Sequence, residues 1–182
     1  EHVAGATGPL YVLILGFLYF LFHDVIWPAK ILGLVCLAAS SVVIYFAARR
    51  MDPTSSIKPL MAGLLGALSP SLLWGALGGM EVPVYLLLAC LGAYFYIGEQ
   101  RTLATLSWAL GVWLRPDGMF LLLLGLVARP RITFKRLLGP GLVATLVVGA
   151  YVSFNFATGG RPLPTSVGVK AHLGGNILAG EW

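Results

Sequence analysis

Two charged corners interrupt this otherwise apolar chain, and both carry residue types that can bind polar ligands. The first is the turn at residues 115–118, Arg-Pro-Asp-Gly, between two short apolar runs at residues 102–114 and 119–128. About 13 helical residues rise only about 20 Å, whereas the hydrocarbon core of a membrane is about 30 Å thick. If both runs enter a membrane, the turn lies below its outer surface. A charge at that depth is costly unless it faces a polar cavity, so the turn is a candidate functional site.

Arg115 supplies a planar, permanently charged guanidinium whose N–H groups match the oxygens of a phosphate. An amphiphile with a phosphate head group would be a natural ligand at this depth. Alternatively, Arg115 forms a salt bridge with Asp117 or Glu81 that only closes a helical hairpin. A further alternative is one tilted helix over residues 102–128, kinked at Pro116. We favour ligand binding, because a purely structural turn would cost less without a buried charge.

Glu81 occupies the second corner, the tight sequence Gly-Gly-Met-Glu at residues 78–81 between two long apolar segments. Its carboxylate could accept hydrogen bonds from sugar hydroxyls or hold a cation. Alternatively, it only interacts favourably with the dipole of the helix that follows it. The sequence alone leaves both interpretations open.

A third group of candidates lies in the Gly- and Pro-rich tail at residues 157–182, which predicts irregular backbone. Its Arg161, Lys170 and His172 could bind a phosphate or an acceptor above the site. An exposed loop without a function is the equal alternative.

The composition indicates an integral membrane protein. The chain is 58% hydrophobic and 10% charged, with a mean hydropathy of +0.88, whereas soluble domains carry about 25% charged residues. The net charge of +5 belongs to short loops and argues against nucleic acid as a partner. Cys36 and Cys90 lie inside apolar runs, so no disulfide or metal site is expected. No P-loop, serine nucleophile motif or dinucleotide fingerprint is present.

Hydropathy predicts an all-α fold, a polytopic transmembrane helical bundle with extracytoplasmic loops. The apolar segments are residues 9–22, 29–48, 59–79, 82–98, 102–114, 119–128 and 137–156. Residues 69–71, Ser-Pro-Ser, predict a kink in the third segment. Residues 9–22 are too short to cross a membrane comfortably, so we expect a short juxtamembrane helix at the outer interface.

The distribution of cations predicts the orientation of these segments. One set of loops carries eight cations, namely Arg49, Arg50, Lys58, Arg101, Arg129, Arg131, Lys135 and Arg136. The opposite set carries four, namely Lys30, Arg115, Arg161 and Lys170. The positive-inside rule makes the first set cytoplasmic. We therefore expect a multi-pass protein of the plasma membrane whose active face is extracytoplasmic.

The chain begins at Glu1 rather than at a methionine. We expect residues 1–182 to form a single partial transmembrane domain of a longer protein. The missing parts would be an N-terminal span with the first outer loop, and a C-terminal part.

Five strings together resemble the GT-C superfamily of membrane glycosyltransferases, which use polyprenyl-phosphate sugars. Residues 1–22 look like the outer loop and short apolar helix of that family, and VVIYFAARRM looks like the end of its next span. GGMEVPVY, LRPDGM and RPLPTSVGVK are similar to its Ser-Gly-Met-Glu-Thr corner, its Thr-Arg-Pro-Glu-Gly turn and its Leu-Pro-Asn-Thr-x-x-x-Lys loop. Their order matches that of the bacterial members related to protein mannosyltransferases and aminoarabinose transferases. Val82, Asp117 and Ser166 depart from the family pattern, which leaves the sugar undetermined.

The resemblance implies an enzyme that transfers a sugar, with inversion, from a polyprenyl-phosphate carrier to a glycan, lipid or protein acceptor. Arg115 and Lys170 would bind the donor phosphate, whereas Glu81, Asp117, His2, Arg161 and His172 would shape the sugar and acceptor pocket. The general-base carboxylate is expected upstream of Glu1. The donor substrate would be the polyprenyl-phosphate sugar, and membrane lipids would be further partners. No cofactor is expected from the sequence and no metal ligand set is seen, which leaves open whether the family's reaction uses a divalent cation.

Two other classes of protein remain as alternatives. A multi-span transporter or lipid flippase predicts inverted repeats and polar residues near the midplane of several spans, which this sequence lacks. A non-catalytic membrane scaffold predicts that Glu81, Arg115 and Asp117 tolerate replacement.

Overall fold

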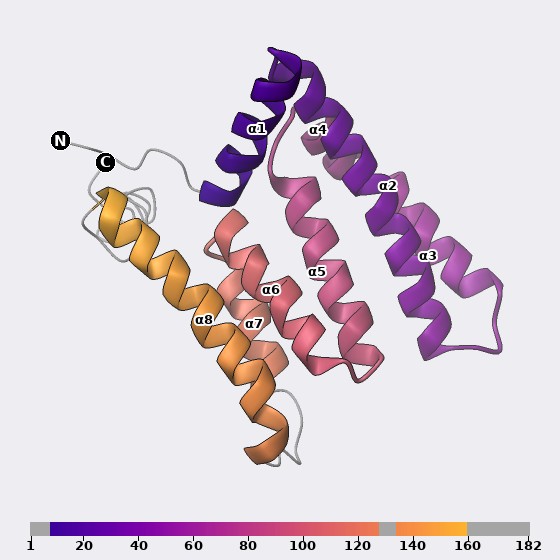
Figure 1. Cartoon of the computed structure of the whole chain (residues 1–182). Coiled ribbons are helices and arrows are strands. Elements are labelled where there is room, and N and C mark those ends of the chain that lie inside the picture. Colours follow the sequence, from indigo (N-terminus) through magenta and orange to yellow (C-terminus); the bar gives the residue numbers. More distant parts are fainter. Residues whose placement is uncertain (1–7, 128–133, 160–182) are drawn as a thin grey trace, which may run out of the picture.

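The computed structural model of the chain describes residues 8–127 and 134–159. Within those ranges all regular structure is helical, which confirms the prediction of an all-α fold (Figure 1). The helices are α1 (Pro9–Phe22), α2 (Ile26–Met51), α3 (Ile57–Ala67), α4 (Pro70–Leu77), α5 (Val82–Ile97), α6 (Arg101–Leu114), α7 (Gly118–Val127) and α8 (Phe134–Gly159).

Two of these helices are long and apolar enough to cross a membrane, namely α2 and the Leu138–Thr158 part of α8. The pair α3 and α4 would make a third span if it is counted as one, and it bends by 46° at its break. The bend follows from Pro70, which begins α4 after the extended backbone of Ser69. The predicted kink at residues 69–71 is therefore confirmed. The predicted segment at residues 82–98 corresponds to α5, which is one of the shorter apolar helices.

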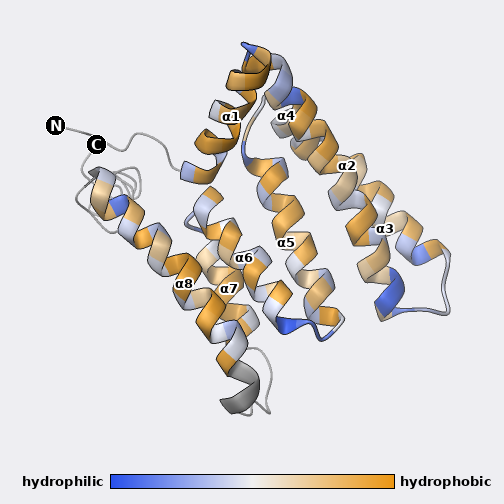
Figure 2. Ribbon diagram, viewed as in Figure 1, coloured by the Kyte–Doolittle hydropathy of each residue, from blue (hydrophilic) through white to orange (hydrophobic). Residues whose placement is uncertain are grey.

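The helices lie side by side in a folded layer with α6 at its centre (Figure 1). On one side α6 packs against α5, which packs against α2, and α2 in turn contacts α3 and α4. On the other side α6 packs against α7 and α8. Apolar residues run along all of these helices, and hydrophilic residues gather near their ends (Figure 2).

Small residues on α6 allow its neighbours to approach closely. Ala104, Ala109 and Val112 are almost completely buried, and Trp108 inserts between α5 and α7. The indole Nε1–H of Trp108 donates a hydrogen bond to the carbonyl oxygen of Ala89 on α5 at 3.2 Å. This single side chain therefore ties α6 to its neighbour without leaving a buried polar group unpaired.

The Arg-Pro-Asp-Gly turn closes a helical hairpin, so the alternative of one kinked helix over residues 102–128 is wrong. Arg115 has an extended backbone, and α7 folds back along α6. A Cβ built on Gly118 would lie 2.9 Å from the carbonyl carbon of Gly111, and one on Gly125 would collide with the Trp108 ring. The two glycines therefore permit the antiparallel contact.

The helix α1 runs from the turn at 115–118 to the start of α2. Gly8 at its start lies against the carbonyl group of Leu114, and its last residue leads through His23 directly to the start of α2. His23 adopts φ 54°, a left-handed conformation typical of a helix C-terminus. With 14 residues, α1 is one of the shorter apolar helices, and its placement at the outer interface stays a prediction.

We predict that Gly118→Ala destabilises the chain by about 1–3 kcal/mol, because its Cβ would press on the backbone of α6 rather than on a movable side chain. Thermal or denaturant unfolding in detergent, followed by circular dichroism, measures this loss. Gly149→Ala is the matched control, since a Cβ there meets nothing within 4 Å and alanine is the better helix former. Equal stability of the two variants would contradict the close hairpin.

Candidate functional site

The three charged residues predicted from the two corners meet in space. Arg115 Nη2 lies 3.2 Å from Asp117 Oδ2, and Arg115 Nη1 lies 3.8 Å from Glu81 Oε1. Three elements position them: Glu81 immediately precedes α5, Arg115 immediately follows α6, and Asp117 lies in the turn before α7. We call Glu81, Arg115 and Asp117 the charged cluster.

The charged cluster is partly open to its surroundings. The side chains of Arg115 and Glu81 are 34% and 30% exposed, whereas that of Asp117 is 67% exposed. An exposed ion pair such as Arg115–Asp117 contributes only about 0–1 kcal/mol, so a ligand could displace it at little cost. The same contacts also fit the alternative in which Arg115 only closes the hairpin.

The end of α6, next to Arg115, lies below the start of α2. Leu114 is fully buried and packs in one apolar cluster with Tyr11, Cys36 and Val84. Cys36 lies ten residues beyond Ile26, the first residue of α2, which corresponds to about 15 Å along the helix axis. The corner before Glu81 lies nearer the start of α2, because Gly79 packs against Ala29. The parts of α1 and α2 that extend past this level expose large apolar side chains, including Phe17, Phe20, Ile26 and Trp27. The charged cluster is therefore recessed relative to an apolar rim.

Glu81 owes its place to the corner between α4 and α5. Gly79 adopts φ 66°, which favours glycine, and the backbone N–H of Met80 donates a hydrogen bond to the carbonyl oxygen of Gly75 at 3.1 Å. The Tyr11 hydroxyl of α1 donates a 2.6 Å hydrogen bond to the carbonyl oxygen of Gly79. This bond fastens α1 to the backbone next to Glu81.

Two tyrosines border the charged cluster, and sequence reasoning gave them no role. Tyr11 is buried, which raises the pKa of its phenol, and the nearby negative charge of Glu81 raises it further. Tyr85 lies within electrostatic reach of Asp117 and Arg115. Its position four residues after Glu81, one helical turn, was the signal available for Tyr85. For Tyr11 the sequence offered none.

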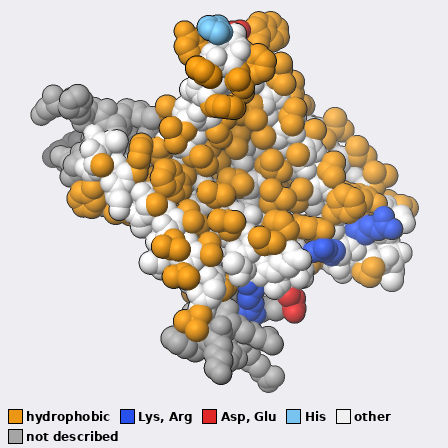
Figure 3. Space-filling view, in the orientation of Figure 1, with side chains coloured by type: hydrophobic (Ala, Val, Ile, Leu, Met, Phe, Trp, Pro, Cys, Tyr) orange, Lys and Arg blue, Asp and Glu red, His pale blue; other side chains and the backbone are white. Residues whose placement is uncertain are grey.

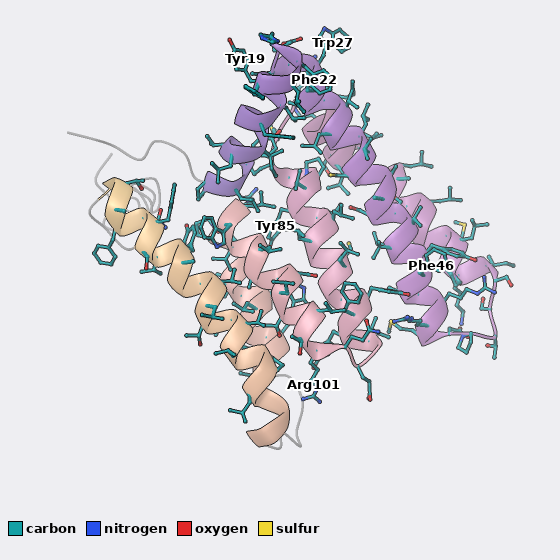
Figure 4. The ribbon with its side chains drawn as sticks, viewed as in Figure 1. Tyr19, Phe22, Trp27, Phe46, Tyr85 and Arg101 are labelled. Carbon is teal, nitrogen blue, oxygen red and sulfur yellow. The ribbon has the colours of Figure 1, made fainter. Side chains whose placement is uncertain are left out.

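An apolar groove of about 520 Å³ separates α1 from α2. The residues that line it are Leu18, Phe22, Asp24, Trp27, Pro28, Ile31, Leu32 and Val35. Leu32 also packs on the cluster of Tyr11, Cys36, Val84 and Leu114, so the groove adjoins the apolar residues beneath Arg115. Phe22 and Trp27 lie near the tip formed by α1 and α2 (Figure 4).

The opposite end of the layer is cationic over the described residues. Lys and Arg side chains gather at that end of the visible face (Figure 3). The described residues there are Arg49 and Arg50 at the end of α2, Lys58 at the start of α3 and Arg101 at the start of α6. Asp52 follows α2 and pairs with Lys58 at 2.7 Å. The hydrogen bond from Lys58 lowers the pKa of the Asp52 carboxyl to about 2. This end holds a second hollow, bordered by Arg101, Gln100 and Pro140, far from the charged cluster in the chain and in the fold.

The remaining predicted site residues, His2, Arg161, Lys170 and His172, lie outside the residues that the structure describes. Their predicted contacts with phosphate or acceptor therefore stay predictions. Over the described ranges, His, Cys, Asp and Glu side chains form no group of three or more that could hold a metal ion.

Neither a family model, nor a curated protein, nor a solved structure matches the chain. The assignment of function therefore depends on the residues and their geometry.

We predict that Tyr11→Phe lowers the free energy of unfolding by about 1 kcal/mol, because the carbonyl oxygen of Gly79 loses its hydrogen bond. Hydrogen exchange at residues 78–85 should accelerate in the same variant. Tyr19→Phe on the same helix is the control, since Tyr19 is 54% exposed. Unchanged stability and exchange in Tyr11→Phe would show that α1 is not fastened to the corner through this bond.

Proposed function

We propose that this chain belongs to a glycosyltransferase of the GT-C type, which moves a sugar from a polyprenyl-phosphate carrier to an acceptor at the extracytoplasmic face of the plasma membrane. The observation that carries the proposal is the recessed charged cluster, in which one arginine is shared by carboxylates from two other elements. Such charge in apolar surroundings is costly, which favours a role in binding a polar group.

The depth of the charged cluster suits the head group of a lipid. If Arg50 lies at the cytoplasmic boundary, the level of Cys36 is about 21 Å into a hydrocarbon core of about 30 Å. Arg115, next to Leu114 at that level, would then remain roughly 9 Å below the outer boundary. A phosphate on a lipid carrier can reach this depth because its apolar chain stays in lipid.

The groove between α1 and α2 offers a path for that apolar chain. Its lining is aliphatic and aromatic apart from Asp24, and through Leu32 it adjoins the apolar cluster that includes Leu114, the neighbour of Arg115 in the chain. Burial of prenyl carbons there is favourable, at about 25 cal/mol per Å² of apolar surface removed from water. A lipid-linked donor therefore fits the arrangement better than a soluble nucleotide sugar, which would require a phosphate-binding loop.

The proposed transfer breaks the bond between the anomeric carbon and the phosphate oxygen. The acceptor oxygen forms the new bond to that carbon, and its proton passes to a carboxylate acting as general base. Arg115 would stabilise the negative charge that develops on the leaving phosphate. Glu81 and Asp117 would accept hydrogen bonds from hydroxyl groups of the sugar or acceptor.

One observation favours a non-catalytic scaffold as the second candidate. Both carboxylates of the charged cluster already face Arg115, so the cluster is paired without any ligand. In that case Arg115 would hold α5, α6 and α7 together and do nothing else. Replacement of Arg115 would then lower stability without any separate loss of ligand binding.

We predict that Arg115→Ala in the intact protein reduces sugar transfer by at least about 100-fold, because a donor to the developing phosphate charge is lost. The assay would follow a labelled sugar from a polyprenyl-phosphate carrier in membrane vesicles, together with the amount of inserted protein. Arg49→Ala at the cationic end serves as control. Transfer at the wild-type rate in Arg115→Ala would overturn the phosphate-binding role.

We further predict that Glu81→Gln lowers transfer more than it lowers the amount of inserted protein, because glutamine keeps the size but not the charge of the side chain. The ratio of activity to inserted protein measures the difference. Asp52→Asn, a carboxylate of the opposite end, should leave that ratio unchanged. Parallel loss of activity and protein in Glu81→Gln would favour a structural role at the start of α5.

A further inference from the structure

Tyr85 follows the corner that carries Glu81 and packs against the helix that ends at the other corner. Its backbone N–H donates a 3.0 Å hydrogen bond to the carbonyl oxygen of Glu81, so it stands one turn into α5. Its ring rests on Gly111 of α6, where an added Cβ would lie 3.4 Å from Cε2. Gly118 of α7 also packs closely against the backbone of Gly111. The Tyr85 side chain is therefore held beside the 115–118 turn, near the adjoining ends of α5 and α6 (Figure 4).

The hydroxyl of Tyr85 has charged neighbours and remains available to a ligand. It lies within electrostatic reach of Asp117 and Arg115. Among the described residues no hydrogen bond engages this hydroxyl, and the side chain is only partly buried. By contrast, the Tyr11 hydroxyl already donates its hydrogen bond to the carbonyl oxygen of Gly79. Of the two tyrosines, Tyr85 is thus the one free to contact a bound molecule.

The charge of the cluster explains why such a hydroxyl would be needed. Arg115 contributes one positive charge, whereas Glu81 and Asp117 contribute two negative charges. A bound phosphate would therefore be repelled by the two carboxylates, and among the described residues of the charged cluster only Arg115 would attract it. A phenol hydroxyl donates a hydrogen bond without adding charge, and hydrogen bonds to charged acceptors are the stronger ones.

We propose that the hydroxyl of Tyr85 donates a hydrogen bond to the same phosphate group that Arg115 binds, which makes Tyr85 a substrate-contacting residue. This inference rests on the proposed function, because it requires a phosphate at Arg115. The ring, fixed against Gly111, sets the position of the hydroxyl, so the bond forms with little loss of side-chain freedom. Tyr85 would thereby help to select a phosphorylated prenyl chain over the free alcohol.

The test compares the binding of farnesyl phosphate and farnesol to the purified chain in nanodiscs of neutral lipid. The variants are Tyr85→Phe, which keeps the ring and its packing, Arg115→Gln, and Tyr94→Phe as control. Tyr94 is on the same helix but beneath Arg50 at the cationic end, with the guanidinium 3.9 Å from its ring centroid. Isothermal titration measures affinity, and thermal unfolding reports whether each variant is folded.

We expect Tyr85→Phe to weaken farnesyl phosphate binding by roughly 10-fold and to leave farnesol binding unchanged. Arg115→Gln should weaken farnesyl phosphate binding further, and Tyr94→Phe should match the wild type. If Tyr85→Phe binds farnesyl phosphate as the wild type does while Arg115→Gln does not, the role of Tyr85 is refuted and the proposed function stands. If the wild-type chain binds both probes equally, the proposed function and this inference both fail.

Discussion

The short hairpin of α6 and α7 is the constraint on which the rest of the structure depends. The 14 residues of α6 rise about 21 Å, against about 39 Å for the 26 residues of α2. The end of α2 at Arg50 and the start of α6 at Arg101 lie at the same end of the layer. Because the two helices differ so much in length, their opposite ends cannot also lie at one level. The hairpin therefore ends beside Cys36, and Arg115 is placed beneath the apolar rim of α1 and the first turns of α2.

Close helix contacts make the charged cluster possible. Gly33 lies so near the backbone of α4 that a Cβ would sit 2.7 Å from the carbonyl oxygen of Ala76, and this approach fixes the corner that carries Glu81. Gly111 and Gly118 do the same for the turn that carries Arg115. Two corners, each set by close glycine contacts, thus bring the Glu81 carboxylate and the Arg115 guanidinium to 3.8 Å from each other. The ion pair itself is weak, so helix packing places the two charges together, and the ion pair does not determine the packing.

Much of this arrangement could be predicted from the sequence, because hydropathy and proline mark helices and breaks locally. The turn at 115–118, the bend at Pro70 and the short helix at residues 9–22 were predicted and are present. The salt bridge between Arg115 and Glu81 was one of several alternatives, because the sequence does not show how helices far apart in the chain pack together. The tyrosines were not predicted, because the Tyr11 bond to Gly79 joins residues 68 apart in the chain. A tyrosine in an apolar helix is equally typical of helix packing and of a membrane interface, so the residue type alone did not indicate a site.

The central claim is that the charged cluster is recessed below the surface of a membrane. Spin labels at Asp117→Cys and Asp24→Cys, in a chain with Cys36 and Cys90 replaced by alanine, test it most directly. Collision with oxygen, which concentrates in the hydrocarbon core, and with a water-soluble nickel complex reports the depth of each label. The account predicts that the label at 117 is measurably deeper than the label at 24, which marks the start of α2. Equal depths, or a label at 117 fully open to the nickel complex, would contradict it.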